Sequence, residues 1–191
     1  MKGCYIFLAP GYEPLEALAP MDVLHRAKVD VKFVSLSDDT VVPSTQGYGI
    51  SAELCWKDFI RSVDRSSGEG CMIFPGGLPG ADSLGENREL MDILTAHFDN
   101  GGLTCAICAA PARVLGTNLK EKLAGRKMTV YSGFENELER YGAICTGKGV
   151  EQDGNLITAK GPGLALEFGL AILERLVDYR VSCVVRKAMM L

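Results

Sequence analysis

The sequence lacks several features that would assign it to a large class of proteins. No run approaches the roughly 20 apolar residues that cross a bilayer, and the first apolar run, CYIFLA, stops at Pro10-Gly11. The net charge of -4 and a pI near 5.3 leave no obvious electrostatic surface for nucleic acid. No cluster of His, Cys, Asp or Glu has metal-ligand spacing, so we expect neither a metal nor another cofactor.

Histidine is the scarcest of the residues used in catalysis. His25 and His97 are the two histidines, both in predicted helices, and we expect each at the surface or in a groove. Neither follows Cys108, the residue singled out below. Cysteine enzymes of the papain or class I amidotransferase type need a histidine after the nucleophile, so a peptidase or amidotransferase is the least favoured enzyme class.

Cysteine is plentiful, but its pattern is not that of a disulfide framework. There are seven cysteines, an odd number. Four of them lie in apolar runs, namely Cys4, Cys71, Cys105 and Cys183. This pattern predicts reduced, buried thiols in a soluble, cytoplasmic protein.

Short apolar runs alternate with amphipathic stretches along the chain. Examples are GCYIFLA, PLEALAPMDVLHRA, VDVKFVSL, CMIFP and RELMDILTAHFDN. The alternation predicts an α/β fold with a mainly parallel sheet covered on both faces. The segment VEQDGNLITAKGPG predicts a hairpin and a turn, and no linker or repeat divides residues 1–191, so we expect a single domain.

Cys108 ends the apolar run LTCAI and is followed by small residues and by Pro111, which favours a first helical turn. This predicts a nucleophile elbow with Cys108 facing a helix N-terminus, which would favour the thiolate by up to about 2 kcal/mol and lower its pKa. The plainer alternative is a buried cysteine that acts as a small hydrophobe. Cys105 forms a C-x-x-C spacing with Cys108, but residues three apart on a strand face opposite sides, so we assign Cys105 to the core.

The segment PGGLPG supplies a second loop at the same predicted sheet edge. Gly76 and Gly77 allow close approach of the backbone to a ligand, and their N–H groups, with that of Ala109, could stabilise an oxyanion. A tight turn between strand and helix is the alternative for a Gly-Gly pair alone.

Glu13 and Glu16 follow the first predicted strand, three residues apart. Carboxylates there usually face solvent or the helix dipole. If Glu16 instead faces the pocket among Leu15, Leu18 and the glycine loop, burial raises its pKa and makes it an acid or base for Cys108.

The segments GYEPLEALAPMDVLHRA, MIFPGGLPGADSL, AICAAP and ITAKGPGLALEFGLAILE together resemble the ThiJ/PfpI superfamily, in its DJ-1-like branch, over nearly the whole chain. The resemblance implies a flavodoxin-like three-layer sandwich, a homodimer, and a nucleophile at Cys108 bonded to a protonated Glu16. It also implies that Glu13 is a second acidic site residue.

The same resemblance implies that the amides of Gly77 and Ala109 bind an oxyanion. It further implies that the turn Gly161-Pro162-Gly163 reaches the site from near the dimer interface. Two departures stand out: Ala109 replaces the histidine of protease-like members, and Tyr131 lies in a segment where some members carry a histidine near the nucleophile.

The activities that the resemblance implies are glutathione-independent glyoxalase, deglycation of methylglyoxal adducts, redox sensing and chaperone action. We therefore expect a cofactor-independent glyoxalase III or deglycase acting on small dicarbonyls or glycated side chains. In this hypothesis Cys108 adds to the aldehyde, Gly77 and Ala109 stabilise the oxyanion, and Glu16 shuttles the proton. The alternative is a redox sensor or redox-regulated chaperone that works through oxidation of Cys108.

Overall fold

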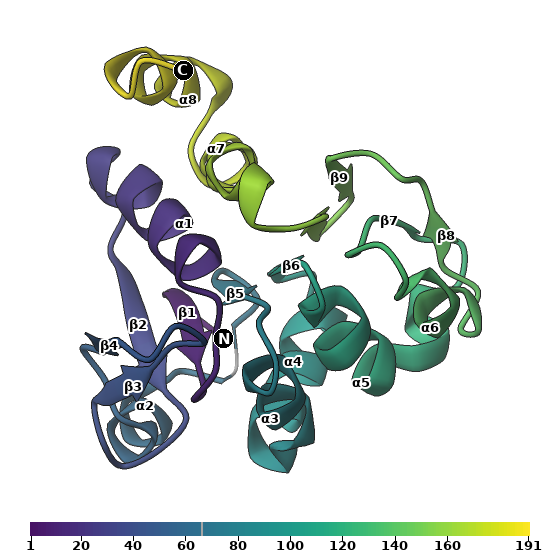
Figure 1. Ribbon diagram of the computed structural model, residues 1–191, viewed down its shortest axis with the longest axis horizontal. Helices are drawn as coiled ribbons and strands as arrows, with labels where there is room; N and C mark the ends of the chain where they lie inside the picture. The colour runs from purple at the N-terminus through teal and green to yellow at the C-terminus, as the bar shows by residue number, and fades with distance from the viewer. Residues whose placement is uncertain (66) are drawn as a thin grey trace.

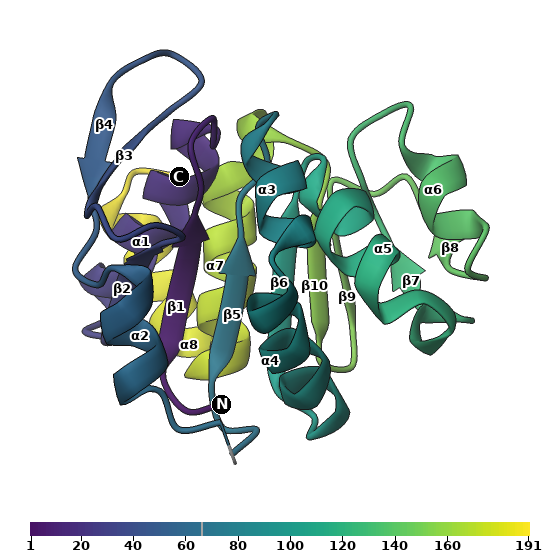
Figure 2. The ribbon, with the colours of Figure 1, turned by 90° about the horizontal axis from the view of Figure 1, so that it is seen from below.

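The computed structural model describes residues 1–65 and 67–191 and contains a central six-stranded sheet (Figures 1 and 2). The strand order is β2-β1-β5-β6-β10-β9, and every neighbouring pair is parallel except β10 with β9. The strands are β1 (Cys4–Leu8), β2 (Val31–Ser35), β5 (Cys71–Phe74), β6 (Leu103–Ile107), β9 (Val150–Asp153) and β10 (Leu156–Ala159). This is the doubly wound order of flavodoxin-like folds, as the sequence predicts.

Helices cover both faces of the sheet, which makes three layers (Figure 1). Helices α1 and α7 pack together on one face with α8 outside α7, and α2 to α5 lie on the other. The helices are α1 (Pro14–Arg26), α2 (Trp56–Ser62), α3 (Gly80–Glu86), α4 (Arg88–Asp99), α5 (Thr117–Leu119), α6 (Glu135–Glu139), α7 (Ala165–Leu176) and α8 (Tyr179–Ala188).

Successive side chains along each strand point to opposite faces of the sheet, so the core has two halves. Phe7 and Phe74 point to the side of α2 to α5, whereas their neighbours Ile6 and Ile73 point to α1 and α7. Because both faces are buried, the strands are apolar almost throughout. The arrowheads of β1 and β5 point to one edge in Figure 2, and there the loops after β1, β5 and the parallel β6 meet.

Several short elements lie outside the main sheet or at its edge. Strands β3 (Val41–Pro43) and β4 (Gly49–Ser51) form an antiparallel pair, and β7 (Lys127–Met128) pairs in parallel with β8 (Ile144–Cys145). Strands β9 and β10 form the predicted hairpin. Two short 3-10 helices span Lys120–Leu123 and Pro162–Leu164.

Three expectations from the sequence are wrong in detail. The segment after Cys108 begins not as an α-helix but as a π-helix, Pro111–Gly116. His97 is fully buried, between the Met1 amino group and the Leu103 carbonyl, because burial of its ring completes the α4 face of the core. Cys183 is only half-buried because it lies on the outer helix α8. All seven cysteines are free thiols.

Candidate active site

Cys108 occupies a sharp elbow directly after β6. Its φ is +64°, a left-handed conformation that side chains other than glycine rarely adopt. Two backbone hydrogen bonds hold it there: its N–H donates to the Ala159 carbonyl, and its carbonyl accepts from the Tyr131 N–H, both at 2.9 Å. A strained conformation that β10 fixes on one side and the loop after β7 fixes on the other is typical of a functional position and confirms the predicted elbow.

Glu16 is brought to this elbow by the first turn of α1. Its side chain is 0% exposed, and its Oε2 accepts a hydrogen bond from the Gly76 N–H at 2.8 Å. Leu15 and Leu18, which the sequence placed beside it, are instead exposed, because positions before and two after Glu16 face away from the sheet. Glu16 is therefore buried by the glycine loop and the elbow alone.

Glu13, the N-cap residue of α1, stabilises the position of Glu16. Its carboxylate caps α1 by accepting from the Glu16 N–H at 2.9 Å, and its own N–H donates to the Gly76 carbonyl at 2.9 Å. The first interaction fixes the start of α1, and the second ties the loop after β1 to the loop after β5. Glu13 is only half-buried, so the structure gives it a cap role at the rim of the site.

The glycine loop packs too tightly for side chains. A Cβ on Gly76 would lie 2.7 Å from the Cys108 Cβ and 2.8 Å from Glu16 Oε2. Gly77 has a φ of +86°, and a Cβ there would lie 2.5 Å from the Glu13 nitrogen. The Gly-Gly pair is thus both a tight turn and the means by which backbone approaches Cys108 and Glu16.

Burial governs the titration of the Cys108 and Glu16 pair. It raises the pKa of Glu16 to about 7, against the effects of the Gly76 N–H and the Cys108 thiol, which lower it. Burial, together with the charge of Glu16, also raises the pKa of Cys108 to about 12. The amides of Ala109 and Gly77 donate to the sulfur and lower this pKa, but by less.

The predicted lowering of the Cys108 pKa is therefore wrong in direction. The expected amide donors are present, yet a buried carboxylate beside the thiol outweighs them. Between the two steps the pair holds one proton and one negative charge. The Glu16 carboxylate is the base that lies next to the Cys108 thiol, and no histidine takes that place.

Tyr131 and Pro162 lie together in a neighbouring pocket of about 210 Å³. The pocket is lined by Tyr131, Ser132, Lys160, Gly161, Pro162, Gly163 and Leu164. Backbone bonds from Tyr131 and Ala159 to Cys108 place its walls directly beside the elbow. Sequence reasoning found Tyr131 and Pro162 but missed Lys160, although it immediately precedes the quoted GPG turn.

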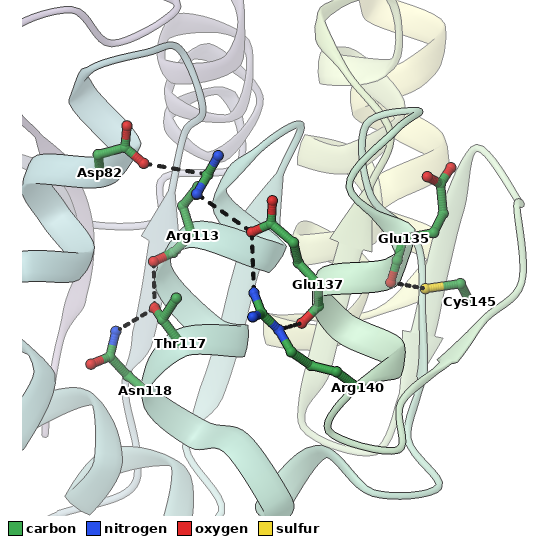
Figure 3. A network of polar contacts seen from close by, with 8 residues as sticks. All are labelled: Asp82, Arg113, Thr117, Asn118, Glu135, Glu137, Arg140 and Cys145. Carbon is green, nitrogen blue, oxygen red and sulfur yellow. Dashed lines mark hydrogen bonds and ion pairs between the residues drawn. The ribbon is translucent and has the colours of Figure 1, made fainter.

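A polar network supports the π-helix that begins after the elbow (Figure 3). Arg113 lies between Asp82 and Glu137, at 3.4 and 3.5 Å, and Glu137 also contacts Arg140 at 3.7 Å. The Thr117 hydroxyl donates to the Arg113 carbonyl at 2.6 Å, which satisfies a carbonyl in the π-helical turn. This support was not evident from sequence because its members come from α3, the π-helix, α5 and the α6 segment.

The structure thus brings Cys108, Glu16, Gly76, Gly77 and Ala109 into direct proximity and places Tyr131 and Pro162 alongside. Among residues 1–65 and 67–191, no group of three or more His, Cys, Asp or Glu side chains is arranged to hold a metal. Within those same ranges, no helix is both long and apolar enough to cross a membrane.

Comparisons with known proteins agree with this geometry. The sequence profile of the DJ-1/PfpI family matches residues 2–175. The chain is 34% identical to Protein DJ-1 homolog A of Arabidopsis thaliana over 92% of this chain, although it spans only 43% of that protein. It is 32% identical to Protein DJ-1alpha of Drosophila melanogaster, over 99% of this chain and 84% of that one.

Solved structures are similar over the whole chain. Drosophila melanogaster DJ-1beta superposes with a TM-score of 0.88 at 31% identity, covering 100% of this chain and 98% of that one. Oxidized Toxoplasma gondii DJ-1 superposes with a TM-score of 0.87 at 26% identity and the same coverage. The profile match, the identities and the shared fold together show that this chain belongs to the DJ-1/PfpI family.

Proposed function

We propose that this chain is a cofactor-independent, cysteine-dependent enzyme that converts small reactive dicarbonyls, or their adducts on protein side chains, into hydroxy acids. The observation that carries the proposal is the contact of the Cys108 thiol with a buried Glu16 carboxyl, between the amides of Gly77 and Ala109. A nucleophile, a base and two oxyanion donors are the parts that addition to an aldehyde requires.

In the first step the Cys108 sulfur attacks the aldehyde carbon of methylglyoxal. The C–S bond forms, the carbonyl electrons move to oxygen, and the thiol proton passes to the Glu16 carboxylate. The Gly77 and Ala109 amides stabilise the oxyanion, which then takes up a proton to give a hemithioacetal. A Glu16 pKa near 7 suits this group to both accept and return a proton at neutral pH.

In the second step Glu16 takes the C1 proton of the hemithioacetal and the C2 carbonyl oxygen takes up a proton, which gives an enediol. Glu16 then returns its proton to the C2 carbon and the C1 hydroxyl loses its proton, which gives the Cys108 thioester of lactate. Water then hydrolyses the thioester, which releases lactate and restores the thiol. The sum is methylglyoxal plus water giving lactate and a proton, with no net oxidation, so no redox cofactor takes part.

Lactate formation by the purified protein tests the proposal. Replacing Cys108 by Ser is expected to lower the rate by at least about 10³-fold, because a serine hydroxyl is a far weaker nucleophile without a histidine base. Glu16→Gln is expected to lower it by about 10²-fold or more, the usual contribution of a general base. Lactate formation that persists unchanged in Cys108→Ser would overturn the proposal.

A redox sensor, or a chaperone under redox control, is a second candidate that two observations favour. Cys108 is half-exposed, and one solved relative is described as oxidized. Mass spectrometry after mild peroxide treatment separates the two functions. Stoichiometric Cys108 sulfinate beside negligible dicarbonyl turnover would favour the sensor, whereas turnover with little oxidation would favour the enzyme.

We further propose a homodimer that covers the outer side of α1. Leu15 and Leu18 are 58% and 43% exposed there, which is unusual for two leucines on a helix next to a site. Light scattering is expected to give twice the chain mass, and Leu18→Glu to give the single mass. We place the protein in the reducing cytoplasm, in keeping with its seven free thiols.

A further inference from the structure

A cationic side chain lines the pocket beside Cys108. Lys160 shares that pocket with Tyr131 and with the turn Gly161–Leu164, and it is half-buried. The rest of the lining is neutral, so Lys160 gives the pocket its only formal charge within the described residues. A pocket of about 210 Å³ matches a ligand of a few heavy atoms.

The backbone of Lys160 follows directly on a residue that is hydrogen-bonded to the nucleophile. Its neighbour Ala159 accepts the hydrogen bond from the Cys108 N–H at 2.9 Å. On the other side, the Tyr131 N–H donates to the Cys108 carbonyl, and the Tyr131 ring lies against Gly161. Adjacent strands are about 5 Å apart, so a short substrate can reach both Cys108 and the lysine stem.

The Lys160 ammonium is available to a ligand. In the part of the chain that the structure describes, it takes part in no ion pair within 4.0 Å. Glu135 is the carboxylate that feels its charge, but one oxygen of Glu135 is already bound to the Gly133 N–H at 2.7 Å. Lys160 thus resembles a binding cation more than a structural one.

We propose that Lys160 selects α-oxoaldehydes that carry a carboxylate two or three carbons from the reacting carbonyls. This inference rests on the proposed dicarbonyl chemistry and names its substrate class. The aldehyde carbon lies at Cys108, and the remote carboxylate pairs with Lys160 over the apolar surface of Tyr131 and Pro162. For 4,5-dioxovalerate the reaction adds one water and gives 2-hydroxyglutarate and one proton.

Steady-state kinetics with two matched substrates test the selection. The acidic 4,5-dioxovalerate is compared with 2-oxopentanal, in which a methyl group replaces the carboxylate. We expect kcat/KM to be about tenfold higher for the acid, mainly through KM, as for a hydrogen bond to a partly exposed charge. Lys160→Met should abolish this preference without slowing 2-oxopentanal, and Lys160→Arg should retain it.

Lys187→Met, a matched change on α8 outside the pocket, should leave the preference intact. Equal rates for both substrates in the wild type, or an equal loss for both in Lys160→Met, would overturn the inference. If neither substrate is turned over, the proposed enzyme function fails, and a second measurement decides on the lysine alone.

That measurement is the ratio of Cys108 alkylation by iodoacetate and by iodoacetamide, followed by peptide mass spectrometry. Both reagents need the same thiolate, so the ratio reports only on how the site treats a negative charge. We expect Lys160→Met to lower the ratio about fivefold or more and Lys187→Met to leave it unchanged. An unchanged ratio in Lys160→Met would show that Lys160 is no anion site.

Discussion

The surroundings of Cys108 differ from those of three other cysteines on the same parallel strands, which form the buried group. Cys4 and Cys71 begin β1 and β5, Cys105 lies within β6, and the sulfur atoms of Cys71 and Cys105 are 3.8 Å apart. All three are buried. Cys108, past the end of β6, is half-exposed and contacts Glu16 and two amides.

A low thiol pKa does not distinguish Cys108 from the three buried cysteines. A hydrogen bond to Cys71, with burial, raises the pKa of Cys4, and burial raises that of Cys71 and of Cys108 alike. The difference is that Cys108 combines partial exposure with an adjacent carboxylate and two backbone amides. In the proposed mechanism the reactive cysteine is the one whose proton has a place to go as the new bond forms.

Replacing Cys108 or Cys71 by alanine gives the largest expected difference in turnover between two variants. Cys108→Ala should reduce dicarbonyl turnover by at least about 10³-fold with little change in Tm. Cys71→Ala should leave turnover per folded molecule unchanged but lower stability by about 1–2 kcal/mol, because it removes a buried sulfur from close packing. Lactate assays and thermal unfolding measure both. Equal losses of turnover in the two variants would erase the contrast.

A side chain added to the glycine loop should make the Cys108 thiol as inaccessible as the three buried cysteines. Gly76→Ala places a methyl group against Cys108 and Glu16, so the loop must move and the Gly76 to Glu16 hydrogen bond lengthens. We expect turnover to fall about 10²-fold, comparable to loss of a positioned general base. A fully active Gly76→Ala would contradict the packing argument.

The pH dependence of the free energy of unfolding tests how the site changes the pKa of Glu16. Its raised pKa means that folding favours the protonated form, so its stabilising effect is complete below pH 4.5 and is lost as pH rises through about 7. Glu16→Gln should therefore exceed the wild type in stability at pH 8 by on the order of 3 kcal/mol, while losing activity.

Denaturant titrations at several pH values measure the difference between the two proteins. His97, whose pKa burial lowers to about 4, changes stability in the opposite direction below about pH 6.5, and it cancels in that difference. A difference that does not grow between pH 4.5 and 8 would contradict the assigned shift of Glu16.

Weakening the network under the π-helix gives the smallest expected effect. Arg113→Met removes the contacts to Asp82 and Glu137 at a site about one-third exposed, so stability should fall by about 1 kcal/mol or less. Cys108 alkylation should change by up to about fivefold, whereas Cys71 and Cys105 stay protected. Arg140→Met, at the exposed end of the network, should change neither.

Much of the fold was predictable because local patterns and burial agree. Both the β1 run CYIFL and the β5 run CMIF are apolar throughout, as strands covered on both faces must be, and α1 coincides with the amphipathic stretch that begins at Pro14. The single domain that the sequence predicts stays a prediction. The π-helical turn was not predictable, since it depends on carboxylates of α3 and α6 that hold the Arg113 side chain and on α5 side chains that donate to its carbonyls.

The candidate site divides in the same way. The sequence alone determined that Cys108 ends a buried strand before a helix, that two glycines follow β5, and that neither histidine follows Cys108 in the chain. Only the tertiary structure decided that Glu16 points inward while Leu15 points outward, and that the Cys108 pKa rises rather than falls. Both outcomes depend on which groups three separate loops bring together, and the charge of a buried pair is set by that proximity rather than by either residue's own segment.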